Sequence, residues 1–220
     1  MLSRFRWTTF DVNDILPENW RRDVVTVAEE ADFHEFPRTP ILTREAADIP
    51  QIERGRVHAG VVRQRLPWLY ELYRGPFLEL ASQACPETVT TARDDRYALV
   101  LNVQRGTSMR FECHVDSDPL SGVLFLTEHA AGGELVVARD PAASRKEAID
   151  QDCTVIRPQP GHLIVFDGRH HPHYARPLTS ESDLRVIATM NFYTESFPES
   201  DRPALLNNFL YGDPLLPKSR

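Results

Sequence analysis

A histidine and an aspartate stand two residues apart in the segment RFECHVDSD, residues 110–118, and both side chains can bind a metal ion. The segment has the texture of a β-strand, in which residues two apart point to the same face. His114 and Asp116 therefore share one face of the expected strand, and Cys113 and Val115 share the other. An imidazole beside a carboxylate could supply two ligands to one metal ion. The alternative is a polar pair in a solvated turn.

A second group of histidines lies far downstream, in the segment RHHPHYARP, and comprises His170, His171 and His173. If the fold brings one of them beside His114, two imidazoles and one carboxylate would meet. That donor set, with the opposite positions on the metal left open, is typical of non-haem Fe(II) oxygenases. The open positions matter because O₂ and a co-substrate must reach the metal.

An arginine, Arg185, interrupts the otherwise apolar run LRVIATM. A charged group in such a strand is costly unless it has a partner. A dicarboxylate is a good partner, because its oxygens match the fork of a guanidinium group. The sequence therefore predicts an anion-binding position on the same strand-rich part of the chain as the candidate metal ligands.

β-rich segments follow one another from about residue 96, separated by Gly, Pro, Asp and Ser. The expected strands cover residues 96–104, 110–116, 121–129, 132–139, 153–158, 161–167 and 183–194. Runs of this length and spacing are typical of an all-β sandwich or barrel. The charged segment 140–152 has no β pattern and is expected to be a surface excursion.

The first part of the chain has a helical rather than a β-strand pattern. Apolar residues at helical spacing predict a helix within residues 17–33 and a second over 67–84, interrupted at Gly75 and Pro76. Residues 36–56 are polar and contain three prolines, which favours a loop. We therefore expect a single domain over residues 1–220, with mainly helical support over 1–95, a β core over 96–195 and a C-terminal tail over 196–220.

The composition is that of an ordinary globular protein. The 220 residues are 41% hydrophobic and 26% charged, and the net charge of −7 argues against a nucleic-acid or anionic-membrane partner. No apolar run reaches the roughly 18 residues that span a bilayer. The three scattered cysteines give no disulfide framework and no metal knuckle. A cytoplasmic location is the resulting expectation; the oligomeric state stays open.

The region from about residue 96 to 194 resembles the 2-oxoglutarate- and Fe(II)-dependent dioxygenases. Their pattern is H-x-D, then a distal histidine in H-x-(apolar)-x-P, and then an arginine. His114, Asp116, His173 and Arg185 match it in that order. The turn GGEL at 132–135 and the strand GHLIVFD also fit. The resemblance implies a mainly β fold with a double-stranded β-helix (jelly-roll) core, and Fe(II), 2-oxoglutarate and O₂ as cofactors and co-substrates.

The same resemblance implies roles for individual residues. The iron ligands would be His114, Asp116 and His173, the last preferred over its two histidine neighbours because Ala175 and Pro177 complete the motif. Arg185 would pair with the far carboxylate of 2-oxoglutarate. Thr189, on the same strand face, and Asn102 are further candidates for contact with the co-substrate. A structural core amide is the alternative for Asn102.

Within the superfamily, the closest likeness is to the group that holds free amino-acid halogenases and their hydroxylase relatives. In those halogenases a glycine or alanine replaces the carboxylate of H-x-D and leaves a coordination site for chloride. Asp116 occupies that site here, so the resemblance implies hydroxylation. Candidate substrate contacts, each with a structural role as its alternative, are Arg110, Asn191 and Tyr193, together with Arg63 and Arg65. The tail around Phe209 and Tyr211 is a candidate lid.

Four functions remain open from the sequence. The leading one is hydroxylation of a free amino acid or similar small polar metabolite. The same iron chemistry could instead end in desaturation or ring formation. A prolyl-type hydroxylase of peptides is a third, although those enzymes commonly have lysine where Arg185 stands. The last is a sandwich that binds metal or ligand without turnover.

Overall fold

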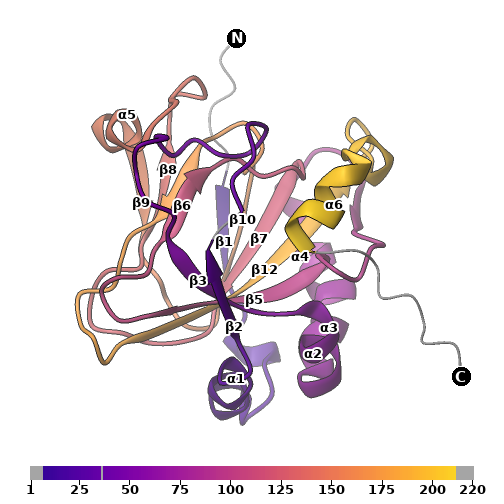
Figure 1. Ribbon diagram of the computed structural model, residues 1–220. Helices are drawn as coiled ribbons and strands as arrows, with labels where there is room; N and C mark the ends of the chain where they lie inside the picture. The colour runs from indigo at the N-terminus through magenta and orange to yellow at the C-terminus, as the bar shows by residue number, and fades with distance from the viewer. Residues whose placement is uncertain (1–6, 36, 212–220) are drawn as a thin grey trace, which may run out of the picture.

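Two facing β-sheets form the centre of the molecule (Figure 1). The computed structural model describes residues 7–35 and 37–211. The larger sheet runs in the order β1-β10-β7-β12-β5-β3-β2, with β4 paired to β12. Its strands are β1 (Trp7–Asp11), β2 (Asp32–Glu35), β3 (Glu53–Val57), β4 (Val89–Thr91), β5 (Leu99–Arg105), β7 (Leu120–Phe125), β10 (His162–Phe166) and β12 (Leu184–Thr194). The smaller sheet, β6-β11-β8-β9, contains β6 (Phe111–His114), β8 (Leu135–Ala138), β9 (Cys153–Ile156) and β11 (His173–Ala175).

The chain crosses repeatedly between these sheets as it runs from β5 to β12. Strands β5, β7, β10 and β12 lie in the larger sheet, and β6, β8, β9 and β11 lie in the smaller one. Neighbouring strands are antiparallel. This winding is the jelly-roll core that the sequence predicts, and it places the segments around residues 114 and 173 side by side.

Helices cover the outer face of the larger sheet. They are α1 (Trp20–Ala28), α2 (Ala59–Arg65), α3 (Pro67–Arg74) and α4 (Pro76–Ala84). Prolines open α3 and α4, a position where the missing N–H costs no helical hydrogen bond. The break at Gly75 and Pro76 is where the sequence predicts it. Two further helices, α5 (Lys146–Gln151) and α6 (Ala204–Tyr211), and the 3-10 turns η1 (Asn13–Ile15) and η2 (Glu199–Asp201) complete the elements.

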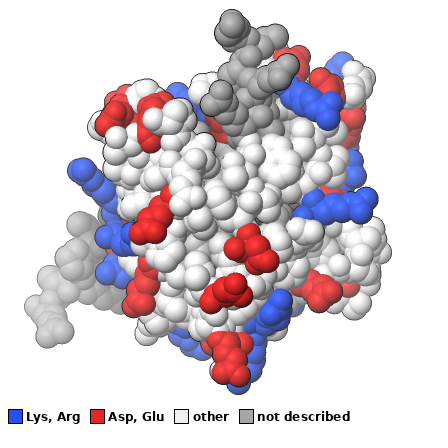
Figure 2. Space-filling model, turned by 180° about the vertical axis from the view of Figure 1, so that it is seen from behind, with Lys and Arg blue, Asp and Glu red and all other residues white. Residues whose placement is uncertain are grey.

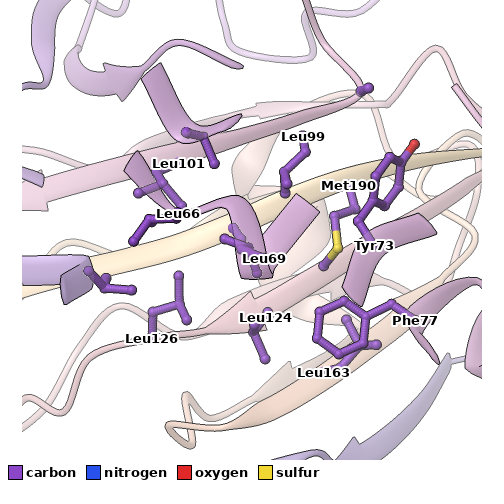
Figure 3. Close-up of a cluster of buried hydrophobic side chains, with 14 of the residues drawn as sticks. Leu66, Leu69, Tyr73, Phe77, Leu99, Leu101, Leu124, Leu126, Leu163 and Met190 are labelled. Atoms are coloured by element: carbon purple, nitrogen blue, oxygen red, sulfur yellow. The ribbon is translucent and has the colours of Figure 1, made fainter. Parts of the chain in front are cut away.

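The main hydrophobic core lies between these helices and the sheet (Figure 3). Leu69 and Phe77 from the helices are fully buried with Leu101 and Leu124 from the strands. Strand alternation sends odd-numbered residues of β5 toward the helices and even-numbered ones into the space between the sheets. The helices therefore hold the outer face of the larger sheet, and its inner face is left to build a site.

The N-terminal part is less helical than the sequence predicts. Strands β1, β2 and β3 come from this part and extend the larger sheet. Strand β3 lies partly within residues 36–56, where the three prolines favour a loop. All three prolines precede the strand, so they do not interrupt its pairing with β5, in which Gly55 faces Val103. A Cβ on Gly55 would lie 2.8 Å from the Phe33 ring, so the glycine permits the close approach of β2.

The back of the molecule carries acidic and basic side chains interspersed with uncharged ones (Figure 2). No single sign of charge dominates the part of this face that the structure describes. None of the helices in the described ranges has the length and apolarity that crossing a bilayer requires. All three cysteines, Cys85, Cys113 and Cys153, are free thiols.

Candidate metal centre

The pairing of β6 with β11 brings the two candidate histidines together. His114 and His173 are direct partners across this antiparallel pair, and their ring centroids are 4.3 Å apart. Strand β6 ends at His114, and Asp116 follows in the loop, where its N–H donates to the carbonyl of Gly168 at 2.9 Å. This bond fixes the backbone at Asp116, and the Asp116 carboxylate faces the two imidazoles.

The three side chains converge on one point. The Nε2 atom of His114 lies 3.4 Å from Oδ1 of Asp116, and that of His173 lies 3.5 Å from Oδ2. Each residue offers one ligand atom, and these three atoms all lie within 4.8 Å of one another. Two imidazole nitrogens and one carboxylate oxygen at this separation form a donor set that suits a divalent transition metal such as Fe(II).

Backbone contacts set the orientation of both rings. The Nδ1 atom of His114 lies 2.6 Å from the carbonyl of Glu112, and that of His173 lies 3.0 Å from the carbonyl of His171. A carbonyl oxygen only accepts, so each Nδ1 donates and each Nε2 presents its lone pair to the centre. Fixing the outer nitrogen in this way is the usual support for a metal-binding histidine.

The ionisation of the group also suits a metal. Burial lowers the pKa of His173 to about 4, so its imidazole is neutral at pH 7. Burial alone would raise the pKa of Asp116, but the neighbouring His173 and His114 outweigh it and hold that pKa below its usual range. Neutral imidazoles and an ionised carboxylate are the forms that coordinate metal ions.

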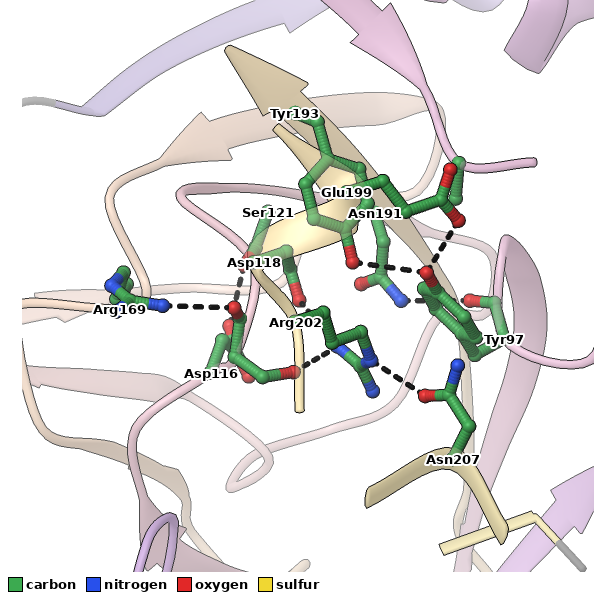
Figure 4. Close-up of polar contacts among 12 residues, drawn as sticks. Tyr97, Asp116, Asp118, Ser121, Arg169, Asn191, Tyr193, Glu199, Arg202 and Asn207 are labelled. Carbon is green, nitrogen blue, oxygen red and sulfur yellow. Dashed lines mark hydrogen bonds and ion pairs between the residues drawn. The ribbon is translucent and has the colours of Figure 1, made fainter. Parts of the chain in front are cut away.

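Asp116 belongs to a polar network that reaches the C-terminal helix (Figure 4). Ser121 Oγ lies 2.5 Å from Oδ2 of Asp116 and 2.9 Å from Oδ2 of Asp118, so its single hydrogen can be donated to either carboxylate. Arg202 lies 4.0 Å from Asp118 and donates through Nε to Asn207 of α6 at 2.6 Å. The loop that carries Asp116 is thereby tied to the C-terminal helix.

Gly168 gives a direct test of this packing. A Cβ at this position would lie 2.1 Å from Oδ2 of Asp116, so Gly168→Ala must displace that carboxylate. We expect the variant to bind Fe(II) about tenfold to hundredfold more weakly in an anaerobic calorimetric titration, as for other changes beside metal ligands. Gly60→Ala is the control, since a Cβ there meets nothing within 4 Å. Equal affinities for both variants would contradict the placement of Asp116.

Arg185 lies at the start of β12, lines the same cavity as the three candidate ligands and is 1% exposed. Its Nη1 donates to Oε1 of Gln104 at 2.6 Å, while its buried Nε has no hydrogen-bond partner among the described residues. Burial lowers the pKa of Arg185 to about 10, so the group is still a cation at pH 7. A buried cation with an open donor suits an anionic ligand.

The GGEL turn makes room for this arginine. Gly133 has a φ of 67°, a left-handed conformation that favours glycine, and a Cβ there would lie 2.6 Å from Cδ of Arg185. The motif therefore has a physical role in the site: it lets the backbone pass close to the guanidinium stem.

The two other candidate contacts to the co-substrate, Asn102 and Thr189, also line the cavity. Asn102 Nδ2 donates to Oγ1 of Thr189 at 2.9 Å. Because this hydroxyl oxygen already accepts a hydrogen bond, its own hydrogen is left to donate elsewhere. The Oδ1 atom of Asn102 is buried with no hydrogen-bond partner in the part of the chain that the structure describes. The pair thus offers one donor and one acceptor.

Of the three main candidates for contact with the substrate, one lines the cavity and two do not. Asn191 lines the cavity, and its Nδ2 donates to the carbonyl of Tyr97 at 2.7 Å. Arg110 does not line it, because its guanidinium is paired with Glu45 at 2.8 Å. Tyr193 does not line it either: β12 extends past the end of the cavity, and the Tyr193 hydroxyl donates to the hydroxyl of Tyr97 at 3.1 Å (Figure 4).

The remaining candidates are two arginines of α2 and two aromatic residues of α6. Arg63 and Arg65 of α2 pair with Asp95 at 2.7 Å and Glu30 at 2.9 Å. Tyr211, at the end of α6, lines the cavity, whereas Phe209 on the same helix is 56% exposed. Only the former is placed to close the site.

Sequence reasoning missed several cavity residues. They are Leu42, Arg54, Arg56, Asp118, Ser121, Arg202 and Leu210. The two arginines of β3 had a usable signal, since Arg54 and Arg56 are two residues apart and precede Val57 in strand spacing. The upstream prolines favour a loop over residues 36–56, so the strand that carries these arginines was not predicted.

Comparison with known proteins gives one family and many similar folds. Residues 97–193 match the model of the 2OG-Fe(II) oxygenase superfamily, where 2OG stands for 2-oxoglutarate. A search of curated proteins finds no significant sequence match. The matched residues include both histidines, Asp116 and Arg185.

Three similar solved structures illustrate the fold. An oxidoreductase of the 2OG-Fe(II) oxygenase family from Burkholderia pseudomallei is 15% identical, with a TM-score of 0.59 over 90% of this chain and 89% of that one. A prolyl hydroxylase from Trichoplax adhaerens, in complex with a hypoxia-inducible-factor peptide, is 12% identical, with a TM-score of 0.57 over 86% and 84%. The carbocyclase SnoK from nogalamycin biosynthesis is 15% identical, with a TM-score of 0.59 over 98% and 91%.

These likenesses are in fold, and the family match covers the segment that carries the site. Each of the family's cofactor requirements also has a counterpart in the described residues: three converging donors for a metal and a buried cation for an anion. Residues 97–193 thus match a superfamily whose members use Fe(II), 2-oxoglutarate and O₂, and the chain shares the fold of a solved oxidoreductase of that family.

Proposed function

We propose that this chain hydroxylates an unactivated C–H bond of a free amino acid or a similar small polar metabolite, using Fe(II), 2-oxoglutarate and O₂. The observation that carries the proposal is the presence of three converging metal donors and a buried arginine around one cavity. His114, Asp116 and His173 would hold the iron, and Arg185 would hold the co-substrate.

The iron, when bound, supplies the activation of O₂ that attack on an unactivated carbon requires. The residues of the protein position the metal ligands, the co-substrate and the substrate. Backbone carbonyls hold the two imidazoles with Nε2 inward, and Ser121 orients Asp116. Arg185 anchors the far carboxylate of 2-oxoglutarate, and the hydroxyl of Thr189 is placed to donate to the same molecule or to the substrate.

A small substrate fits the shape of the site. Leu210 and Tyr211 of α6 line the cavity together with Leu42, so these residues form part of the wall around the metal donors. Asn191 offers an amide to a polar substrate within this space. Asp116 fills the coordination position that chloride would need, which favours hydroxylation over halogenation. A cytoplasmic location remains a prediction.

The test is succinate formation from 2-oxoglutarate with Fe(II) and O₂, screened across free amino acids and short peptides, with the product identified by mass. The proposal predicts stimulation by an amino acid or small metabolite and a product that has gained one oxygen atom. Stimulation only by peptides would support a prolyl-type hydroxylase instead. A product lacking two hydrogens would indicate desaturation or ring closure. A chlorinated product, or no succinate under any condition, would refute the proposal.

A further inference from the structure

A β-bulge lies in β6 directly before the metal-site histidine. Across the pairing of β6 with β11, His173 faces His114 and Ala175 faces Phe111, so two steps along β11 match three steps along β6. In a regular strand, residues three apart point to opposite faces. Phe111 and His114 nevertheless both line the cavity, as the extra residue of the bulge allows. Bulges commonly re-aim a side chain next to a functional site, and this one re-aims His114.

The bulge also provides the backbone group that orients the His114 ring. Its two inner residues are Glu112 and Cys113, and the carbonyl of Glu112 accepts the hydrogen bond from Nδ1 of His114 at 2.6 Å. The direction of this carbonyl depends on the local backbone. A shift of the bulge would therefore turn the imidazole and move its Nε2 away from the other two donors.

Arg38 holds the side chain of Glu112. This carboxylate is 1% exposed and accepts hydrogen bonds from Nε of Arg38 at 2.9 Å and from Nη2 at 2.6 Å. Two parallel bonds of this kind fix the orientation as well as the distance. The same guanidinium donates to the carbonyls of Ile49 at 2.7 Å and Pro50 at 3.1 Å, and the N–H of Ile52 donates to the Glu112 carboxylate at 3.2 Å. Glu112 is thereby tied to the segment that precedes β3.

The segment 38–45 also covers the open edge of β6. Strand β6 ends the smaller sheet, so β11 is its neighbour in that sheet on one side only. On the other side, the N–H of Arg44 donates to the carbonyl of Cys113 at 2.8 Å, and the N–H of Val115 donates to the carbonyl of Leu42 at 2.9 Å. The backbone around the bulge is therefore held by this segment as well as by the sheet.

We propose that Arg38 is a positioning residue for the metal centre, and that it acts through Glu112 to fix the bulge that directs Nε2 of His114 at the metal. The proposal rests on the proposed function, in which His114 is a metal ligand. Arg38 is not among the residues that line the cavity, so its effect on the centre passes through β6. Replacing it should weaken metal binding although all three ligands are still present.

The test is a calorimetric titration of Co(II) into the whole chain with 2-oxoglutarate, since the visible absorption of Co(II) also reports the geometry of its ligands. We expect Arg38→Met to bind Co(II) about tenfold to hundredfold more weakly, as for other partners of metal ligands. Its Co(II) spectrum should differ from that of the wild type. Arg38→Lys keeps the charge but loses the two parallel bonds, so a smaller loss is expected.

Arg96→Met is the matched control. Arg96, in the turn before β5, makes the same paired contact with Asp94, from Nε at 3.0 Å and from Nη2 at 2.6 Å. Losing this pair removes a similar ion pair that does not contact Glu112. The control should therefore bind Co(II) with an affinity and a spectrum close to those of the wild type.

A double variant separates positioning from general stability. Arg38→Met leaves the buried Glu112 carboxylate without its cation, which destabilises the fold, whereas Arg38→Met together with Glu112→Met replaces both charges with apolar groups. We expect the double variant to unfold at a higher temperature than Arg38→Met does. It should still bind Co(II) as weakly, because the bulge remains untethered.

Two outcomes would overturn the positioning role: Arg38→Met binds Co(II) as tightly as Arg96→Met with an unchanged spectrum, or the double variant regains wild-type affinity together with stability. If Arg38→Met does not fold, Arg38→Lys and the double variant carry the comparison. The wild-type titration separates this from the proposed function. A wild type that binds no Co(II) refutes the metal centre itself, whereas binding that does not depend on Arg38 refutes only the positioning role.

Discussion

Replacing His173 with alanine is expected to lower the conversion of 2-oxoglutarate to succinate by about a thousandfold or more, because metal catalysis depends on the fixed ligand set. His173 provides one of three donors, its ring is oriented by the carbonyl of His171, and it is buried against its partner His114. The same variant should bind Fe(II) far more weakly, because two ligands remain where three are needed. Succinate is measured in the presence of saturating 2-oxoglutarate and Fe(II).

The neighbouring His170 provides a matched control. It belongs to the same histidine cluster, but it is exposed and lies 2.9 Å from Asp167, outside the cavity. His170→Ala should therefore retain activity close to that of the wild type. If the two alanine variants lost activity equally, or if His173→Ala were as active as the wild type, the choice of His173 as the distal ligand would be wrong.

Arg185→Gln should raise the KM for 2-oxoglutarate by about a hundredfold, the scale of effect when one partner of a buried charge pair is removed. The reason is that glutamine replaces a buried cation whose Nε is open to the cavity. Arg185→Lys keeps the charge but loses the planar fork, so a smaller increase is expected. The measurement is the dependence of succinate formation on 2-oxoglutarate concentration.

The metal centre should be largely spared, so Fe(II) affinity distinguishes this effect from general damage to the site. Arg105→Gln is the control on the neighbouring strand, because Arg105 pairs with Glu29 at the surface. A KM that stays unchanged in Arg185→Gln, or that rises equally in both variants, would show that another residue binds the co-substrate.

The parts of the fold that could be predicted are those with a strong local pattern. The strands of the jelly roll alternate or are continuously apolar, since the helices on one side and the second sheet on the other bury them. The interruption between α3 and α4 follows from a proline that fits only the first turn of a helix. The identity of His173 as the partner of His114 depends on register between distant strands, and only the motif resemblance predicted it.

The parts that could not be predicted owe their form to tertiary contacts. Strand β3 presents Arg54 and Arg56 to the cavity, so it lacks the apolar alternation that marks a half-buried strand. Strand β11 has three residues, too few for a periodic pattern. Arg110 has a suitable charge and lies close to the metal ligands in sequence, but its pairing with Glu45 directs it elsewhere.

These misses share a physical cause. Residues that line a cavity are selected for a ligand, so their polarity opposes the pattern of the element that carries them. The same property makes them informative once the fold is known, because a buried charge without a protein partner requires another explanation.

The most direct test of the central claim is an anaerobic titration of Fe(II) into the wild-type chain with 2-oxoglutarate, followed by the visible absorption of the iron–2-oxoglutarate complex. If His114, Asp116 and His173 hold one iron beside Arg185, absorption rises to a plateau at one equivalent of Fe(II) per chain, and Asp116→Ala shows a much weaker rise. An identical plateau in Asp116→Ala, or no absorption from the wild type, would contradict the assignment of this cavity as the metal centre.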